Sequence, residues 1–392
     1  MGQILSLCGI ALGGLLIQRI LRLDLTLASL LSGTLAAIVI PAMELDIGLR
    51  AHHVKDLVFF VFLPLLVFEA AWHIQPAQLK RWLIPALLLA TLGLLISAFV
   101  TGVGIYLGIN HPIGFPWVAA FLTGAILAAT DPVAVIAKLK ALKAPEGLTT
   151  LFEGESLFND TTAVVLFGLM LSLALHQTNS ASIGGLFLSV LFGGIAIGLV
   201  SGTLTLLAIH FIQQPPATIA LLVFCAFGSF YVAEHSFHVS GIMAVMSAAM
   251  LTRVRLGQSA QHCAGVDLTW EWLGLVLNTL LFALMGLVLT LDMFVEQWLA
   301  MLIAIGAALL ARLAAVWFCV GLLQLGQYPL PEGWGWILCA GGLRGGIAVA
   351  LVLSLPVELP YWWTIQSMVF GVVLFSLLVQ GAISGRLIQR LC

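Results

Sequence analysis

Residues 150–167 read TLFEGESLFNDTTAVVLF, and this stretch places three carboxylates, Glu153, Glu155 and Asp160, between apolar runs. Of the 392 residues, 61% are hydrophobic and only 8% are charged, whereas soluble domains carry about 25% charged residues. The mean hydropathy is +1.14, and apolar runs of about 20 residues recur along the chain. The sequence therefore predicts an all-α, polytopic membrane protein. Its net charge of -2 gives no sign of a nucleic-acid partner.

Polar residues, prolines and glycines divide the chain into about thirteen predicted transmembrane spans. The break between the eighth and ninth spans, at His235–His238, is weak, so twelve spans are an alternative. The chain 1–392 is expected to form a single membrane domain without a soluble C-terminal regulatory domain. The predicted spans are 3–21, 26–42, 55–74, 82–107, 115–140, 148–175, 183–212, 218–236, 237–253, 270–290, 297–323, 333–355 and 362–390.

The distribution of basic residues predicts a cytoplasmic C-terminus. With thirteen spans and this orientation, only Arg50 and Lys55 fall outside, and Arg312 and Arg344 lie within spans. This asymmetry agrees with the positive-inside rule, and we expect a bacterial inner membrane. The basic residues placed on the cytoplasmic side are Arg19, Arg22, Lys80, Arg81, Lys138, Lys140, Lys143, Arg253, Arg255, Arg386 and Arg390.

Two spans contain helix-breaking sequences: ATDP at 129–132 and GGLRGG at 341–346. In a bilayer, the freed backbone groups are tolerated only beside protein or a wet cavity. The two broken spans are seven apart, as expected if 1–175 repeats, inverted, as 218–392, with 183–212 as a connector. Paired broken helices in inverted repeats point to the binding site of a secondary transporter. The alternative, that the glycines only allow close packing, does not explain why each break also carries a charge.

Six charged residues lie inside predicted spans, where each costs about 2.5–3.5 kcal/mol if it faces lipid. We therefore expect them to face one another or a wet cavity. Asp131 precedes Pro132 and so lies at the break, where it either neutralises a helix terminus or binds an ion. The six residues are Glu69, Asp131, Glu155, Asp160, Arg312 and Arg344.

Asp160 is the strongest candidate for an ion site. Ser156 precedes it by four residues, so both side chains share one helix face, and their oxygens suit a hard cation. Glu69, near the end of its span, is a further carboxylate, although it could also reach water. Arg312 needs a buried partner, for which Glu155 is the candidate. Arg344 competes for that carboxylate, and the sequence alone does not choose between the two.

Several motifs resemble the sodium/proton exchangers of the cation/proton antiporter family. They are ATDPVAV at 129–135, FEGESLFND at 152–160, GGLRGGIA at 341–348, LPLLVFEAA at 63–71 and ARLAAV at 311–316. The resemblance spans nearly the whole chain and implies a thirteen-helix homodimer with a six-helix core domain and a dimerisation domain. In the core domain, two unwound helices would cross.

The same resemblance implies roles for particular residues. Asp160 would carry the ion and the proton, with Ser156 and Glu69 supplying side-chain oxygens and Thr130 a backbone carbonyl as further cation ligands. Asp131 would neutralise the helix break, Asn159 would form a hydrogen bond beside it, Glu155 would pair with Arg312, and the second broken helix would carry Arg344. The pair Asn159-Asp160 resembles the electroneutral, NhaP-like branch, which exchanges one cation for one proton.

We therefore expect a secondary active antiporter, with no cofactor, that exchanges Na⁺ or Li⁺ for H⁺ across a membrane and serves pH homeostasis. The cation and the proton would compete at Asp160, and the site would open to one side at a time. A K⁺/H⁺ antiporter of the same fold is an alternative. An intramembrane aspartyl protease would need a G-x-G-D motif, which is absent, so the chain is not expected to be an enzyme. A cation channel would need a repeated filter motif, which is also missing.

Overall fold

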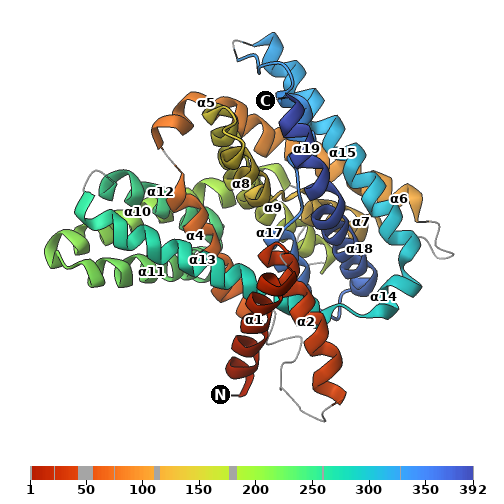
Figure 1. Ribbon diagram of the computed structural model, residues 1–392. Helices are drawn as coiled ribbons and strands as arrows, with labels where there is room; N and C mark the ends of the chain where they lie inside the picture. Colours follow the sequence, from red (N-terminus) through yellow and green to blue (C-terminus); the bar gives the residue numbers. More distant parts are fainter. Residues whose placement is uncertain are drawn as a thin grey trace. The chain divides into compact units, whose positions relative to one another are not determined.

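A computed structural model of the protein describes residues 2–21, 23–42, 56–74, 76–109, 115–175, 183–257, 260–326 and 328–391. In these ranges the secondary structure is helical and contains no strand (Figure 1), which confirms the predicted all-α class. Three basic residues used to predict the orientation, Arg22, Arg50 and Lys55, lie outside the described residues.

The chain divides into two compact units. Unit 1 comprises Met1–His73, Leu188–Leu291 and Leu353–Pro356, and unit 2 comprises Ile74–Phe187, Asp292–Val352 and Val357–Cys392. To within a few residues, the first three spans of each predicted repeat fall in unit 1 and the last three fall in unit 2. The inverted repeat itself stays a prediction.

Unit 1 is organised around stacked aromatic side chains. Phe68 stacks on Trp72 and on Trp270, with ring centroids 6.2 and 4.4 Å away. The weak break between the eighth and ninth predicted spans is real, since one helix ends at Ser236 and the next begins at Gly241. The helices of unit 1 are α1 (Gly2–Leu21), α2 (Leu25–Ala42), α4 (Leu63–His73) after a π-helical turn (Val58–Phe62), most of α10 (Ile183–Ile212), α11 (Pro215–Tyr231) with a π-helical turn (Val232–Ser236), α12 (Gly241–Leu256) and α13 (Ala260–Val288).

Unit 2 contains both interrupted helices. A buried cluster that includes Leu151, Phe152, Val316 and Leu338 joins α9, α15 and α16. The helices wholly or mainly in unit 2 are α5 (Pro76–Leu88) and α6 (Leu94–Gly108) joined by a π-helical turn (Leu89–Gly93), α7 (Trp117–Ala128), α8 (Val133–Ala141), α9 (Glu146–Ala174), α14 (Leu291–Glu296), α15 (Trp298–Leu325), α16 (Trp334–Gly341), α17 (Gly346–Leu353), and α18 (Trp362–Phe375) joined to α19 (Gly381–Leu391) by a π-helical turn (Ser376–Gln380).

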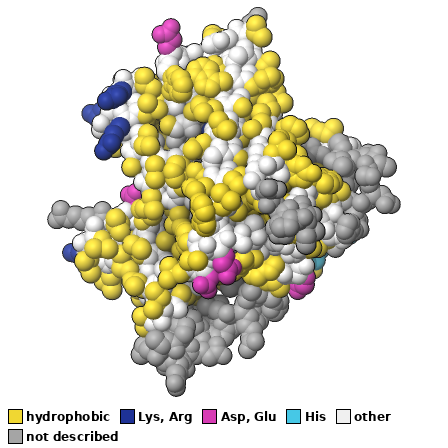
Figure 2. Space-filling model, turned by 90° about the vertical axis from the view of Figure 1, so that its right-hand side faces the viewer, with side chains coloured by type: hydrophobic (Ala, Val, Ile, Leu, Met, Phe, Trp, Pro, Cys, Tyr) yellow, Lys and Arg dark blue, Asp and Glu magenta, His cyan; other side chains and the backbone are white. Residues whose placement is uncertain are grey.

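The surface is that of a membrane protein. Hydrophobic side chains cover most of the described part of the face in Figure 2, and Lys and Arg gather in small groups. Large side chains such as Phe211, 83% exposed, and Phe224, 74% exposed, point outward. Among the described residues, eight helical segments are long and apolar enough to cross a bilayer, and four shorter apolar helices accompany them. The total of thirteen spans stays a prediction.

Candidate functional site

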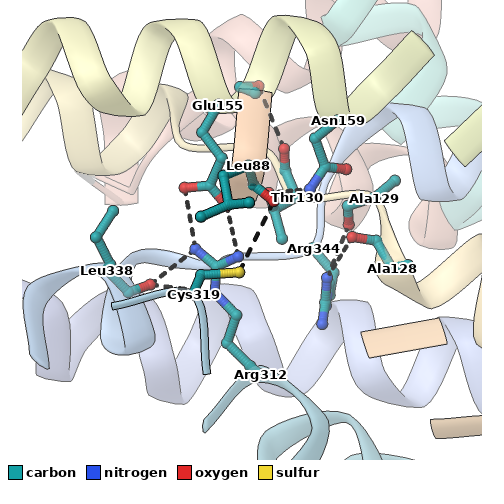
Figure 3. Close-up of polar contacts among 11 residues, drawn as sticks. Leu88, Ala128, Ala129, Thr130, Glu155, Asn159, Arg312, Cys319, Leu338 and Arg344 are labelled. Carbon is teal, nitrogen blue, oxygen red and sulfur yellow. Dashed lines mark hydrogen bonds and ion pairs between the residues drawn. The ribbon is translucent and has the colours of Figure 1, made fainter. Parts of the chain in front are cut away.

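The first break separates α7 from α8. Pro132 has no N–H to donate and disfavours helix at Asp131, so α7 ends at Ala128 and α8 begins at Val133. The carbonyls of Ala128 and Ala129 are thereby freed, and both accept hydrogen bonds from Nη1 of Arg344, at 3.0 and 3.1 Å (Figure 3). The guanidinium group of Arg344 thus lies at the C-terminal end of α7, which carries a partial negative charge.

The second break, between Gly341 and Gly346, contacts the first directly. The N–H of Asp131 donates to the carbonyl of Leu343, at 2.8 Å. A Cβ on Gly345 would lie 2.1 Å from Oδ2 of Asp131, so only glycine fits at this approach. The two interrupted helices therefore meet at their breaks, as the crossing of two broken helices requires.

Asp131 connects the starts of two half-helices. Its Oδ1 accepts the N–H of Val133, at 3.0 Å, and its Oδ2 accepts the N–H of Gly346, at 3.2 Å. These residues open α8 and α17, whose N-termini carry positive partial charge. Both carboxylate oxygens are thus bonded to backbone amides.

Arg312 forms hydrogen bonds at the C-terminal end of α16, the half-helix that precedes the second break. Its Nε and Nη2 donate to the carbonyl of Leu338 in the last turn of α16, at 3.1 and 2.9 Å. Its Nη1 and Nη2 also donate to Oε1 and Oε2 of Glu155, at 2.5 and 3.2 Å (Figure 3). Both side chains are buried. The sequence left the partner of Glu155 open, and the structure pairs it with Arg312. The backbone N–H of Arg344 instead donates to Oγ of Ser376, at 2.8 Å.

Asp160 lies on α9 beside the first break. Oγ of Ser156 is 3.2 Å from the carbonyl oxygen of Thr130 and 3.5 Å from Oδ2 of Asp160. Nδ2 of Asn159 donates to Oγ1 of Thr130, at 3.3 Å. Oδ1 of Asp160 and Oδ1 of Asn159 are buried, and neither accepts a hydrogen bond from the described residues. A carboxylate oxygen in such a place needs a partner, which can be a proton, a cation or a water molecule.

The site offers three kinds of oxygen that could coordinate a cation: the carboxylate of Asp160, the hydroxyl of Ser156 and the backbone carbonyl of Thr130. Oxygen ligands of this kind suit hard cations. Among the described residues, no group of three or more His, Cys, Asp or Glu side chains is placed to hold a metal ion.

Glu69, which was expected to be a further ligand, belongs to unit 1, whereas Asp160 belongs to unit 2. Within unit 1, Oε1 of Glu69 is 3.2 Å from Nδ1 of His73. The side chain also lies against α13, where a Cβ on Gly274 would come within 2.8 Å of it. The role of Glu69 as a cation ligand stays a prediction.

Sequence reasoning missed three partners near the site. The carbonyl of Leu338 and the hydroxyl of Ser376 belong to no recognisable motif. Every residue has a backbone carbonyl, and a serine in an apolar span gives no sign of its partner. The third is Lys140, whose Nζ lies 3.0 Å from Oε1 of Glu153. This pair could have been predicted, because Lys140 and Glu153 carry opposite charges on the two helices that the turn at 141–145 connects.

Two interrupted helices that meet at their breaks are typical of the binding site of a secondary transporter. Comparison with known families agrees: residues 5–390 match the family model described as sodium/hydrogen exchanger, transmembrane. The chain therefore belongs to the sodium/hydrogen exchanger family, whose members are transporters and not enzymes.

Two relatives illustrate the similarity. The chain is 35% identical over 347 residues to the Na(+)/H(+) antiporter ApNhaP of Aphanothece halophytica, covering 86% of this chain and 65% of that protein. It is 36% identical over 372 residues to the Na(+)/H(+) antiporter NhaP of Pseudomonas aeruginosa, covering 90% and 85%. The chain thus spans less than two thirds of the length of the first relative and 85% of the second.

The fold is also that of a solved structure. The sodium proton antiporter MjNhaP1 of Methanocaldococcus jannaschii matches with a TM-score of 0.84 and 19% sequence identity, covering 97% of this chain and 98% of that one. At this identity the match concerns the fold.

Proposed function

We propose that the protein exchanges a monovalent cation, Na⁺ or Li⁺, for H⁺ across a membrane, and that the two compete at Asp160. The observation that carries the proposal is the buried Oδ1 of Asp160, which accepts no hydrogen bond from the described residues. Relatives named as Na(+)/H(+) antiporters support the same choice of ions.

In this mechanism, a cation binds to the carboxylate of Asp160, Oγ of Ser156 and the carbonyl of Thr130. A proton on Asp160 removes its negative charge and with it most of the attraction for the cation. An empty, ionised carboxylate is costly to move through a bilayer, so the site moves loaded with one ion or the other. Alternating exposure of the site to the two sides then couples the two fluxes. Glu69 is the proposed ligand from unit 1.

Asp131 acts on this site indirectly. Because both of its oxygens accept backbone N–H groups, we assign it to holding the two crossing half-helices. This assignment also argues against an intramembrane aspartyl protease, in which both carboxyls must be free to activate one water.

The proposed stoichiometry is one cation per proton. The residue before Asp160 is Asn159, an amide that does not titrate and that bonds to Thr130. A single carboxyl group at this position carries one charge, so the exchange is expected to be electroneutral.

The proposed assembly is a homodimer in a bacterial plasma membrane with a cytoplasmic C-terminus. Basic residues near predicted cytoplasmic span ends support this orientation, and the bacterial sources of the relatives support the location.

The test uses purified protein in proteoliposomes that contain a pH-sensitive dye. Sodium addition is expected to change the internal pH of vesicles with the wild type and to have no effect with Asp160→Asn. Asp292→Asn, a matched change at an exposed residue of α14, serves as the control. Exchange that survives in Asp160→Asn would rule out the mechanism.

A series with Li⁺, Na⁺ and K⁺ separates the proposed function from a K⁺/H⁺ antiporter. Clamping the membrane potential at several values tests the stoichiometry, because the rate of an electroneutral exchanger should not change.

A further inference from the structure

His73 lies one turn after Glu69 at the end of α4, and one nitrogen of its ring faces two oxygens of that residue. Nδ1 of His73 is 3.0 Å from the backbone carbonyl oxygen of Glu69 and 3.2 Å from its Oε1. A carbonyl oxygen and an ionised carboxylate only accept hydrogen bonds, so Nδ1 carries a hydrogen whether the ring is neutral or charged. Nε2 is therefore the atom at which the ring gains and loses its proton.

A glycine of α13 makes room for the carboxylate of Glu69. A Cβ on Gly274 would lie 2.8 Å from Cδ of Glu69 and 3.1 Å from its Oε1. A larger residue at 274 would thus push the carboxylate out of this place. The packing of α13 and the ring of His73 together determine where this oxygen lies.

The last turn of α4 is held by a separate polar cluster. Oδ1 of Asp267 on α13 accepts hydrogen bonds from Nε1 of Trp72, at 2.7 Å, and from Nη1 of Arg253 on α12, at 2.9 Å. The guanidinium group of Arg253 also lies over the ring of Trp72, 5.2 Å from its centroid. Because these contacts fix the turn that carries Glu69 and His73, the side chain of Glu69 can change its partner while the backbone stays in place.

We propose that His73 is a positioning residue for Glu69, which holds this carboxylate while no cation is bound and competes with the cation for it. A proton on Nε2 gives the ring a positive charge, which strengthens its hydrogen bond to the carboxylate and so weakens cation binding. Protons thereby oppose the cation at Glu69 as well as at Asp160. This inference rests on the proposed function and on the proposed role of Glu69 as a ligand.

The exposure of the pair suits such competition. The side chain of His73 is 40% exposed and that of Glu69 is 25% exposed. Ion pairs this open to water are weak, so a cation that also binds other oxygens can displace the imidazole.

Few other charges act on His73. From α13 the charged group is Asp267, which is already bonded to Arg253 of α12. Helix α11 and the turn Val58–Phe62 also pack against α4, and neither contains Asp, Glu, Lys, Arg or His. A change in the charge of His73 therefore acts mainly on Glu69.

The experiment measures the KM for Na⁺ and the maximal rate of exchange in proteoliposomes at about pH 6 and about pH 8, where an ordinary histidine is mostly charged and mostly neutral. His73→Gln still donates a hydrogen bond but gains no charge, so it is expected to lower KM about threefold at the acid pH only. His73→Lys is charged at both values and is expected to raise KM about threefold at the alkaline pH only. Neither variant is expected to change the maximal rate.

Two further variants test whether the effect passes through Glu69. Glu69→Gln is expected to raise KM at both pH values, and adding His73→Gln should then change nothing more. His210→Gln is the matched control, since this histidine is exposed on α10, and it should leave KM as in the wild type.

The outcomes separate this inference from the proposed function. If His73→Gln and His73→Lys keep the wild-type dependence of KM on pH while the wild type exchanges sodium for protons, the inference is wrong and the proposed function stands. An equal shift in His210→Gln would also overturn the inference. If the wild type shows no sodium-dependent proton movement, the proposed function is wrong and the inference falls with it.

Discussion

Arg312 holds Glu155 through two hydrogen bonds, with nitrogen–oxygen distances of 2.5 and 3.2 Å, and the same guanidinium bonds to the carbonyl of Leu338. The pair thus joins α9, α15 and α16 within unit 2. Because both side chains are buried, loss of either one leaves an uncompensated charge or a broken network.

Glu155→Gln should lower the stability of the protein by about 3–5 kcal/mol, because Arg312 then stays buried without a carboxylate. Thermal unfolding in detergent measures the change. Glu153→Gln is the matched control, since this side chain is partly exposed in its pair with Lys140, and it should cost at most about 1 kcal/mol. Equal losses in the two variants would contradict the structural role of the Glu155–Arg312 pair.

Asp131→Asn should destabilise the protein by about 1–3 kcal/mol. The amide retains one acceptor oxygen, but it loses the negative charge at the starts of α8 and α17 and one of the two N–H bonds. Unfolding in detergent reports the stability, and the exchange rate should fall because the crossing of the half-helices supports Asp160. A variant as stable and as active as the wild type would show that these hydrogen bonds do not hold the crossing.

Gly345→Ala should be among the most damaging single-methyl additions. Its Cβ would lie 2.1 Å from Oδ2 of Asp131 and 2.4 Å from Cβ of Asp131, so the contact between the two breaks must open. We expect loss of exchange and a lower unfolding temperature. Gly306→Ala is the control, because nothing lies within 4 Å of its Cβ position in α15, and it should gain about 0.5–1 kcal/mol. The prediction is wrong if Gly345→Ala behaves like Gly306→Ala.

Ser156→Ala should raise the KM for Na⁺ by about five- to tenfold, equivalent to roughly 1–1.4 kcal/mol, through the loss of one oxygen ligand. Proton-coupled sodium uptake measured over a range of Na⁺ concentrations tests this. Ser367→Ala is the control, since its buried hydroxyl donates within α18 to the carbonyl of Trp363. A rise in KM of the same size in Ser367→Ala would remove the support for Ser156 as a ligand.

The interruptions of the helices could be predicted from the sequence because their causes are local. Pro132 lacks the N–H that would continue the helix before it and disfavours helix at Asp131, and the glycine pairs at 341–342 and 345–346 allow a non-helical backbone. Both interruptions are four residues long, since α7 ends at Ala128 and α8 begins at Val133, while α16 ends at Gly341 and α17 begins at Gly346.

The partners of the charged residues could not be predicted in the same way. Glu155 and Arg312 are 157 residues apart, and both Arg312 and Arg344 satisfied the demand for a buried cation near Glu155. The tertiary packing decides between them, because it places Arg312 beside Glu155 and Arg344 beside the end of α7. Similarly, Arg344 neutralises carbonyls that are freed 215 and 216 residues earlier, and no pattern within span twelve indicates which helix end it reaches.

Thr130, Ser156 and Asp160 all belong to unit 2. The charged residues that form hydrogen bonds around the two breaks, Asp131, Arg312 and Arg344, belong to the same unit. In the proposed mechanism, any displacement of that unit would therefore move Thr130, Ser156 and Asp160 together as an intact group, and the ion would keep the same ligands from this unit throughout.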